Sequence, residues 1–470
     1  MNKYKLTAFL TAGAMVLCGT VSDIPLVSSA EEPALSQDTQ SFYEYWKDKY
    51  IVQDPYITDD AQYFVYYSEE KYSGSEPVAV TVSEAHGYGM LITACMAQYD
   101  SDAKEIFDGM YRFYKCHTSS IGPALMAWQQ ADNGSAIVNI SGADSASDGD
   151  MDIAYALLIA DCVWGSGGDI DYRTAAEDVI NDIMKYEVNK TDWVIQLGDW
   201  AVWSEEGDEY YAATRASDFI MQYMPVFAEV TGDDRWMNVH RSTYDIINSF
   251  IDEYGTGILP DFIVKDSSTG KFIAAPPDFL ESENDGNYYY NSCRTPWRIS
   301  MDYLINGDAD AKRFADTINS FIKKSTGSDP WEIKAGYTPD GNAVEYYNDL
   351  CFVAPFLVAA SCGDDRSWET IVRDTVVNYG DDVYYGDTIK MLCLISADGG
   401  FIVPEAAACV TGDVNGDGRL SLADAVMLQK YIAAGGTLNN PDAGDVTNDG
   451  KINILDLCEM KNLIINTKEV

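Results

Sequence analysis

The chain has 470 residues and a net charge of −44, from 75 acidic and 31 basic residues. Nucleic acids and anionic membrane surfaces both bind through clustered Lys and Arg, so this charge argues against either as a partner. Hydrophobic residues make up 47% of the chain, which is enough for a large core. A soluble protein that acts on a neutral or cationic substrate fits both numbers.

Residues 1–30 have the pattern of a secretory signal peptide. Lys3 and Lys5 precede the apolar run "LTAFLTAGAMVLCGTV", and "SSA" provides small residues for cleavage after Ala30. No later apolar run is long enough to span a bilayer. We therefore expect a secreted, extracellular protein.

Residues 31–400 are predicted to form one mostly helical domain. Apolar residues recur at spacings of three and four in "DIAYALLIADCVW", "ASDFIMQYMPVFAEV" and "DAKRFADTINSFIKK". Connectors rich in Gly, Asp and Tyr separate these segments, and strand-like alternation is sparse. The expected fold class is all-α, with long loops available for function.

Two of the predicted helices begin with acidic residues. In "VSEAHGYGMLITAC", Ser83 is a plausible N-cap and Glu84 falls in the first turn, where an isolated Glu usually complements the helix dipole. In "SASDGDMDIAYALLIADCVW", Ser147 and Asp150 have the spacing of a capping box. Three alternating acids, with Asp148 and Asp150 at the mouth of the helix, exceed what capping requires.

Several tryptophans are candidates for stacking on a sugar ring. Trp128 lies in "ALMAWQQ", and Trp200 and Trp203 lie in "LGDWAVW". Aromatic faces stack on apolar sugar faces, but each of these residues could equally belong to the core.

The segment "PPDFLESENDGNYYYNSCRTPWR", residues 276–298, concentrates acids, tyrosines and arginines. If this segment is part of an active site, one of its acids is expected to do the chemistry. Tyr288 and Arg294 adjoin them, and we expect both to hydrogen-bond substrate or water. The chain has three histidines, which indicates catalysis without a metal.

After a predicted short linker at 401–411, residues 412–466 contain an internal duplication. "GDVNGDGRLSLAD" (412–424) and "GDVTNDGKINILD" (444–456) are each followed by an apolar periodic segment. Each repeat matches a calcium-binding loop, with oxygen donors at positions 1, 3, 5, 9 and 12, a carbonyl at 7 and Gly at 6. The predicted ligands of two structural Ca²⁺ ions are Asp413, Asn415, Asp417, Arg419, Ser421 and Asp424 in the first loop, and Asp445, Thr447, Asp449, Lys451, Asn453 and Asp456 in the second.

A final Asp ligand, with one helix after each loop, resembles the type I dockerin module. The resemblance implies attachment to a cohesin of a scaffold protein in a cellulosome-type complex. Thr447 replaces the usual Asn or Asp, which predicts a weaker second site. Leu422–Ala423 and Ile454–Leu455 replace the Ser-Thr pair of the best-known dockerins, which predicts an unusual cohesin partner.

The segments "SEAHGYGM", "ASDGDMDIAYALLIADCVW" and "CRTPWR" together resemble glycoside hydrolase family 8. The resemblance implies an (α/α)6 barrel and inverting endo-cleavage of β-1,4-linked glucan, mixed-linkage glucan, xylan or chitosan. By the matching motifs Glu84 is the general acid. Asp148 is expected to hold the sugar at the cleavage point, with Asp150 as second choice for that role.

Asn291 is the one departure that bears on activity. Many family members have their base aspartate there, but a branch with Asn takes its base from a loop just upstream. Glu281 is the predicted base, with Asp278, Glu283 and Asp285 as rivals. The preferred substrate is β-glucan, cut by an endoglucanase or licheninase activity. The alternatives are a chitosanase, a xylanase, or an inactive carbohydrate-binding subunit.

Overall fold

The computed structural model describes residues 35–68, 70–404, 412–415, 420–436, 438, 440–447 and 450–466. The predicted signal peptide lies outside these residues, as does most of the predicted linker. Three predicted calcium ligands, Asp417, Arg419 and Asp449, also lie outside them.

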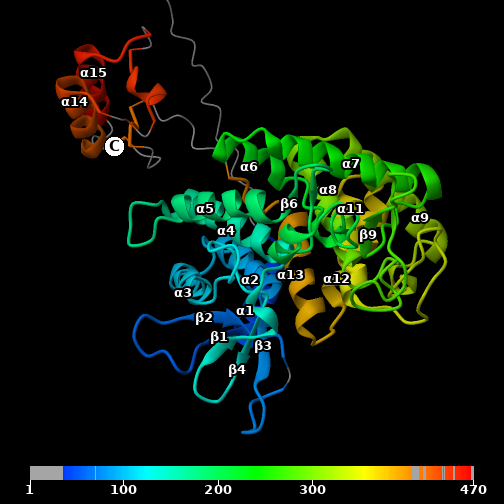
Figure 1. The fold of residues 1–470 in the computed structure, drawn as a ribbon. Helices are drawn as coiled ribbons and strands as arrows, with labels where there is room; N and C mark the ends of the chain where they lie inside the picture. Colours follow the sequence, from blue (N-terminus) through cyan, green and yellow to red (C-terminus); the bar gives the residue numbers. More distant parts are fainter. Residues whose placement is uncertain are drawn as a thin grey trace, which may run out of the picture.

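Residues 35–404 form two concentric rings of helices (Figure 1). The inner ring consists of α2 (Ser83–Cys95), α4 (Ser147–Trp164), α6 (Tyr223–Thr231), α8 (Thr295–Asn306), the consecutive pair α10 (Leu350–Val353) and α11 (Pro355–Ser361), and α13 (Tyr384–Ala397). The outer ring consists of α1 (Gln37–Tyr50), α3 (Ala103–Cys116), α5 (Tyr172–Tyr186), α7 (Arg235–Tyr254), α9 (Ala309–Thr326) and α12 (Arg366–Asn378). The expected (α/α)6 barrel is confirmed, and 52% of the described residues are helical and 9% are in strands.

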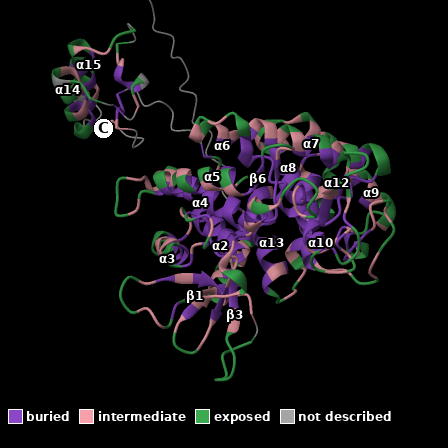
Figure 2. Ribbon diagram, viewed as in Figure 1, coloured by how far each residue is buried: buried purple, intermediate pink, exposed green. Residues whose placement is uncertain are grey.

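Burial follows the two rings. The inner helices α2, α4 and α13 are apolar on nearly every side and are buried along most of their length, whereas α3, α7 and α9 bury one face (Figure 2). A helix that is hydrophobic all round belongs inside, and an amphipathic one covers it. The ring closes because α13 contacts both α2 and α1.

The strands form small antiparallel sheets in the loops that precede inner helices. β3 (Val78–Val82), β4 (Gln129–Asp132) and β5 (Ile137–Asn139) form one sheet, with Val82 opposite Gln129. β8 (Thr214–Arg215), β9 (Phe262–Lys265) and β10 (Phe272–Ala274) form another. The pairs β1 (Ile51–Gln53) with β2 (Tyr63–Val65), and β6 (Val188–Asn189) with β7 (Val194–Ile195), complete them. Because β3 runs directly into α2, its sheet fixes where that helix begins.

Two glycines bring the starts of α2 and α4 together. A Cβ atom on Gly149 would lie 2.6 Å from the Ser83 backbone, and one on Gly87 would lie 2.7 Å from the Asp152 Cβ. Only Gly permits this approach, which sets the first turns of the two helices side by side.

Residues 412–466 form a second, smaller unit. α14 (Leu422–Ala434) and α15 (Ile454–Asn466) pack on each other around a core that includes Val414, Leu428 and Met460. A short 3₁₀ turn, η6 (Asp442–Gly444), precedes the second predicted calcium loop.

None of the described helices has both the length and the apolar content needed to cross a membrane.

Candidate active site

Glu84 and Asp148 meet at the mouth of the barrel through one arginine. Glu84 lies in the first turn of α2, as predicted, and Asp148 in the first turn of α4. Arg294, just before α8, places Nη1 2.5 Å from the Glu84 Oε2 and 3.1 Å from the Asp148 Oδ2. The same Nη1 lies 2.8 Å from the Tyr88 hydroxyl. Three inner helices therefore deliver three charged groups to one point.

The Asp148 carboxylate is held in its charged form. Burial raises the pKa of this group, but Arg215 and Arg294 outweigh burial, so its pKa is lowered overall. Arg215 Nη2 lies 3.1 Å from the second carboxylate oxygen, Oδ1, and the Gly149 N–H donates to the same oxygen. Asp148 is therefore a fixed negative charge beside Glu84.

The environment of Glu84 favours the protonated form. Its pKa is raised, because burial and the Asp148 charge together outweigh the opposing guanidinium of Arg294. The side chain is 20% exposed, whereas those of Asp148 and Arg294 are 4% and 1% exposed. Of the three, Glu84 is thus the group that reaches solvent.

Asn291 links this cluster to Glu281. Its amide Nδ2 donates to the Glu281 Oε2 at 2.9 Å, and its Oδ1 accepts from Arg294 Nη2 at 3.3 Å. Nδ2 also lies 3.3 Å from the Asp261 carboxylate. An aspartate at this position would face two carboxylates, whereas the amide donates to both. With Glu281 and Asp261 both beside position 291, Asn avoids the repulsion that an Asp would meet there.

The rival acids of the loop have other positions. Asp285 is buried and accepts three backbone N–H groups, from Leu280, Glu281 and Ser282, at 2.6–2.9 Å. It shapes the turn that presents Glu281. Asp278, Glu281 and Glu283 are all exposed, but of these three only the Glu281 side chain hydrogen-bonds Asn291 among the described residues. Phe279 anchors the loop in a small apolar cluster with Phe262 and Ala275.

Asp261 was not identified from the sequence. Its buried carboxylate accepts the backbone N–H groups of Tyr289, Asn291 and Ser292 at 2.7–3.0 Å, and so fixes the turn that carries Asn291. Burial raises its pKa to about 6, against the effect of these hydrogen bonds. No motif surrounds it in the sequence, since it simply precedes the strand "FIVK".

Comparison with known proteins identifies both units. Glycosyl hydrolases family 8 matches residues 26–399, and the dockerin type I domain matches residues 411–465. The chain belongs to glycoside hydrolase family 8. It is therefore a glycoside hydrolase, and it carries a type I dockerin domain.

The relatives with high identity are glucanases. A beta-glucanase of Niallia circulans is 46% identical over 322 residues, which cover 68% of this chain and 76% of that protein. Endoglucanase A of Acetivibrio thermocellus is 30% identical, over 77% and 75% of the two chains. The solved beta-1,3-1,4-glucanase from Paenibacillus sp. X4 superimposes with a TM-score of 0.72 at 41% identity, over 80% of this chain and 95% of that one. A cold-adapted family 8 xylanase, at 15% identity and a TM-score of 0.63, shares the fold.

Three of the predicted substrate contacts are buried in this structure and hydrogen-bond protein atoms. Asp150 is fully buried, and its Oδ1 accepts the Met126 N–H at 2.7 Å. The Tyr288 ring is also fully buried, and its hydroxyl donates to the Cys293 carbonyl. The Arg294 side chain is buried, and its N–H groups donate to protein acceptors, among them the carbonyl and side-chain oxygens of Asn291. Arg294 also contacts the carboxyl groups of Glu84 and Asp148 and holds them in place.

The predicted helix caps also differ from the structure. α2 begins at Ser83 itself, after Val82, without a side-chain cap. Ser147 likewise lies inside α4, and its hydroxyl donates to the Gln196 carbonyl rather than to its own helix. In the buried barrel mouth, neighbouring loops provide hydrogen-bond partners for these residues, such as the Gln196 carbonyl for Ser147.

The aromatic candidates differ in accessibility. Trp128 is half-buried, and its indole N–H donates to the Ser141 carbonyl. Trp200 is half-buried and packs edge-to-face on Tyr210, which in turn contacts Phe279 of the Glu281 loop. Trp203 is 69% exposed. The stacking roles of Trp128 and Trp200 stay predictions, and Trp203 is the most exposed of the three.

Asp150 instead forms a buried acid pair with Glu187. Burial raises the pKa of Glu187 to about 8, and that of Asp150 well above its usual value. The Glu187 Oε1 accepts from the Ser145 hydroxyl. Among the described residues, the other carboxyl oxygens of the two acids have no donor apart from each other. Burial without such donors favours a protonated form of this pair.

We expect Glu187→Gln to flatten the loss of stability as pH rises from about 5 to about 8. Between the unfolded pKa near 4.5 and about 8, the folded state keeps a proton that the unfolded state releases, so stability falls by up to about 1.4 kcal/mol per pH unit. The amide N–H of Gln can donate to the Asp150 carboxylate, and an amide has no proton that titrates in this pH range. Thermal unfolding from pH 5 to 9 should show a variant whose Tm gains on the wild type as pH rises. Glu283→Gln, at an exposed site, is the control, and parallel curves for Glu187→Gln would contradict a protonated form of the pair.

The two dockerin loops repeat the same hydrogen bonds. Asp424 accepts the backbone N–H groups of Asn415 and Ser421, and Asp456 accepts those of Thr447 and Asn453. In each loop the acid at position 12 thus binds positions 3 and 9. Both carboxylates are fully buried at the loop, and every predicted side-chain donor is an oxygen, which fits a hard cation such as Ca²⁺. Type I dockerin domains bind calcium, and family 8 catalysis needs no cofactor.

Proposed function

We propose that this chain is an inverting endo-β-glucanase that hydrolyses β-1,4 linkages, with mixed-linkage β-1,3-1,4-glucan as its preferred substrate. The observation that carries the proposal is the hydrogen-bonded path from Glu84 through Arg294 and Asn291 to Glu281. It joins the proposed acid, Glu84, to the proposed base, Glu281, at one site. The identity to a beta-glucanase and to a beta-1,3-1,4-glucanase supports the choice of substrate.

In the proposed mechanism Glu84 protonates the leaving oxygen of the glycosidic bond. Glu281, as a carboxylate, takes a proton from the water that attacks C1 on the opposite face of the sugar. Inverting enzymes separate these groups by about 6.5–9.5 Å so that water fits beside the base. Asp148 keeps Glu84 protonated by like-charge repulsion and offers a fixed negative charge to the sugar in the transition state.

A substrate panel tests this function. Wild-type protein is assayed for reducing sugar on mixed-linkage glucan, carboxymethylcellulose, xylan and chitosan, and the anomeric configuration of the first product is read by proton NMR. We expect highest activity on mixed-linkage glucan and an inverted product. Highest activity on chitosan or xylan would overturn the substrate, and no activity on any polymer would favour an inactive carbohydrate-binding subunit.

The dockerin would attach the enzyme to a cohesin of a scaffold protein, outside the cell. Positions 10 and 11 of the loops are exposed and apolar, with Leu422, Ile454 and Leu455 each more than half exposed. Leu422 and Ala423 also line a groove together with Met427 and Tyr431. Because the two loops match, we propose that each presents an equivalent apolar contact to a cohesin with an apolar recognition surface.

Removal of calcium should separate the two activities. We propose two Ca²⁺ sites in the dockerin, whose loops require the ion to neutralise their acids. Chelation by EDTA is expected to abolish binding of a cohesin module, measured by biolayer interferometry, and to leave glucan hydrolysis unchanged. Adding excess CaCl₂ should restore binding. A parallel loss of hydrolysis would contradict a role for calcium confined to the dockerin.

A further inference from the structure

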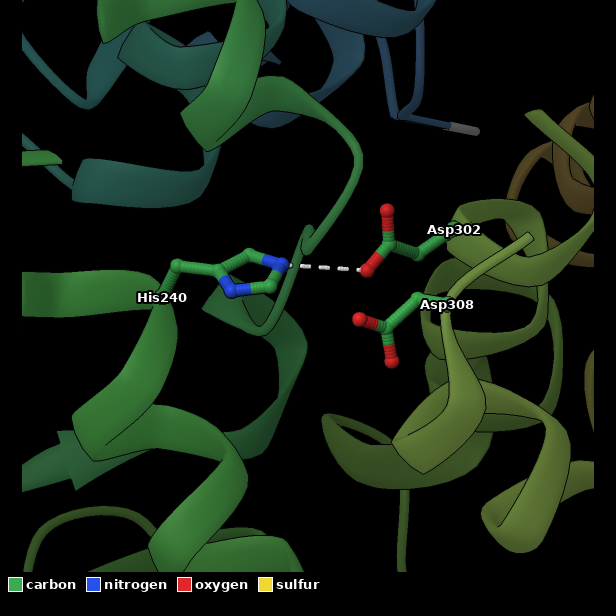
Figure 3. Close-up of side chains that lie close together, drawn as sticks. All are labelled: His240, Asp302 and Asp308. Atoms are coloured by element: carbon green, nitrogen blue, oxygen red, sulfur yellow. Dashed lines mark hydrogen bonds and ion pairs between the residues drawn. The ribbon is translucent and has the colours of Figure 1, made fainter. Parts of the chain in front are cut away.

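A histidine and two aspartates from separate helices converge away from the catalytic groups. His240 lies on α7, Asp302 near the end of α8, and Asp308 directly before α9. One ligand atom of each residue lies within 4.8 Å of the others. Figure 3 shows the three side chains directed toward one another, with the His240 Nε2 facing the Asp302 carboxylate. Asp302 follows Arg294 by eight residues, about 12 Å along a helix, so the cluster is distinct from the active site.

Groups outside the cluster fix the orientation of both carboxylates. The Tyr244 hydroxyl donates to the Asp302 Oδ2 at 2.6 Å, and the Asn306 amide donates to Oδ1 at 2.6 Å. Asp308 caps α9, so its Oδ1 accepts backbone N–H groups from Asp310 and Ala311. Outer hydrogen bonds of this kind hold ligands in place around a protein-bound metal. The second oxygen of Asp308 has no donor among the described residues.

The charge balance of the cluster favours a cation. Asp302 is 1% exposed and His240 is 12% exposed. Among the described residues, no Lys or Arg forms an ion pair with Asp302 or Asp308, and the only ion pair of Asp302 there is with His240. His240 Nε2 lies 3.1 Å from the Asp302 Oδ2, a separation that two ligands of one tetrahedral ion also have. The cluster has two carboxylates and one imidazole, so its negative charge exceeds its positive charge. A bound cation would neutralise the difference.

We propose that His240, Asp302 and Asp308 bind a divalent transition-metal ion, with Zn²⁺ as the representative. Imidazole nitrogen with two carboxylates is a donor set for Zn²⁺ and its neighbours, whereas Ca²⁺ and Mg²⁺ take oxygen ligands. The ion would join α7 to the turn between α8 and α9, so its effect is on the stability of the barrel and not on hydrolysis.

The test is zinc binding by the full-length protein in excess CaCl₂, which fills the dockerin loops, after alkylation of accessible thiols. Isothermal titration with ZnCl₂ measures affinity, and thermal unfolding measures the shift in Tm. His240→Gln retains an N–H donor for Asp302, and Asp308→Asn retains the helix cap, so both variants keep the structural roles and lose a ligand. We expect each to weaken zinc binding at least tenfold and to abolish the zinc-dependent rise in Tm.

Asp316→Asn, which removes an exposed acid from α9, is the matched control and should bind zinc as the wild type does. Glucan hydrolysis should be unchanged in all three variants. Equal zinc affinity in the wild type, His240→Gln and Asp308→Asn, or no binding by the wild type, would overturn the proposal and leave the cluster as an ion pair between helices.

Discussion

Glu281→Gln is expected to lower kcat on mixed-linkage glucan by about 100- to 10,000-fold, with little change in KM. Gln keeps the size of the side chain and can still hydrogen-bond Asn291, but it cannot take a proton from water. Binding of the sugar does not depend on this proton transfer, so the loss falls on kcat. Initial rates over a range of glucan concentrations separate the two constants, and circular dichroism checks the fold.

Glu283→Gln is the matched control for this loss. It removes one charge from the same loop, two residues away, at an exposed side chain. Its kcat should equal that of the wild type. If Glu283→Gln instead caused the loss and Glu281→Gln did not, the base assignment would be wrong.

Asn291 allows a sharper form of the same test. In Glu281→Gln the carboxylate that faces Asn291 is gone, so an added Asn291→Asp meets less repulsion and places an acid where many family members have their base. We expect the double variant to be more active than Glu281→Gln alone. Asn291→Asp by itself should be impaired, because it sets a carboxylate against both Asp261 and Glu281. Additive losses in the double variant would show that position 291 cannot supply a base in this site.

Local sequence patterns were enough to predict a helical domain and the places of Glu84 and Asp148 at the starts of two helices. Apolar periodicity located helices of both rings, α4, α6 and α9, and helix-start signals put Glu84 and Asp148 in first turns. One available signal was missed. Asp148 and Asp152 are four residues apart, as are Arg294 and Arg298, and residues at this spacing share a helix face. In the structure Asp148 pairs with Arg294, and Asp152 with Arg298 in the fully buried interior.

The burial of Asp150 has a geometric cause. Two residues along an α-helix turn the side chain by about 200°, so Asp150 faces away from Asp148. The sequence shows that three acids alternate, but which of them faces the substrate depends on the side of α4 that meets the other inner helices. Apolar residues reveal the inward side of a helix only when the opposite side is polar. Residues 147–160 of α4 are all buried, so the sequence does not show which side faces the other inner helices.

The acids of the 276–298 loop could not be ranked by sequence for a different reason. Glu281, Glu283 and Asp285 have similar neighbours along the chain. They differ in the structure because Asp285 turns inward to three backbone N–H groups and thereby directs Glu281 toward Asn291. The burial of Tyr288 could not be predicted locally either, since its ring packs beside Phe352, 64 positions away along the chain.

Glu84→Gln should be severely impaired on glucan, by about 100- to 10,000-fold in kcat, but far less impaired on a dinitrophenyl oligoglucoside. Cleavage of a sugar–sugar bond needs a proton on the leaving oxygen, and Gln cannot donate one as an acid. Dinitrophenolate leaves without protonation, so the acid is dispensable for that substrate. Reducing-sugar release and dinitrophenolate absorbance measure the two reactions. Glu105→Gln, an exposed first-turn glutamate of α3, is the control that removes a helix-start charge outside the site.

The pH dependence of kcat/KM on glucan should identify the same residue. Glu84 acts when protonated, so activity is lost as pH rises through its raised pKa, above the ordinary value of 4.5. Asp148→Asn removes the neighbouring negative charge that helps to raise this pKa, and the alkaline limb should therefore move to lower pH whatever happens to the maximal rate. Glu84→Gln acting on the dinitrophenyl substrate should lack the limb. If the limb stayed at the wild-type pH in Asp148→Asn, the like-charge interaction between α2 and α4 would not be what keeps Glu84 protonated.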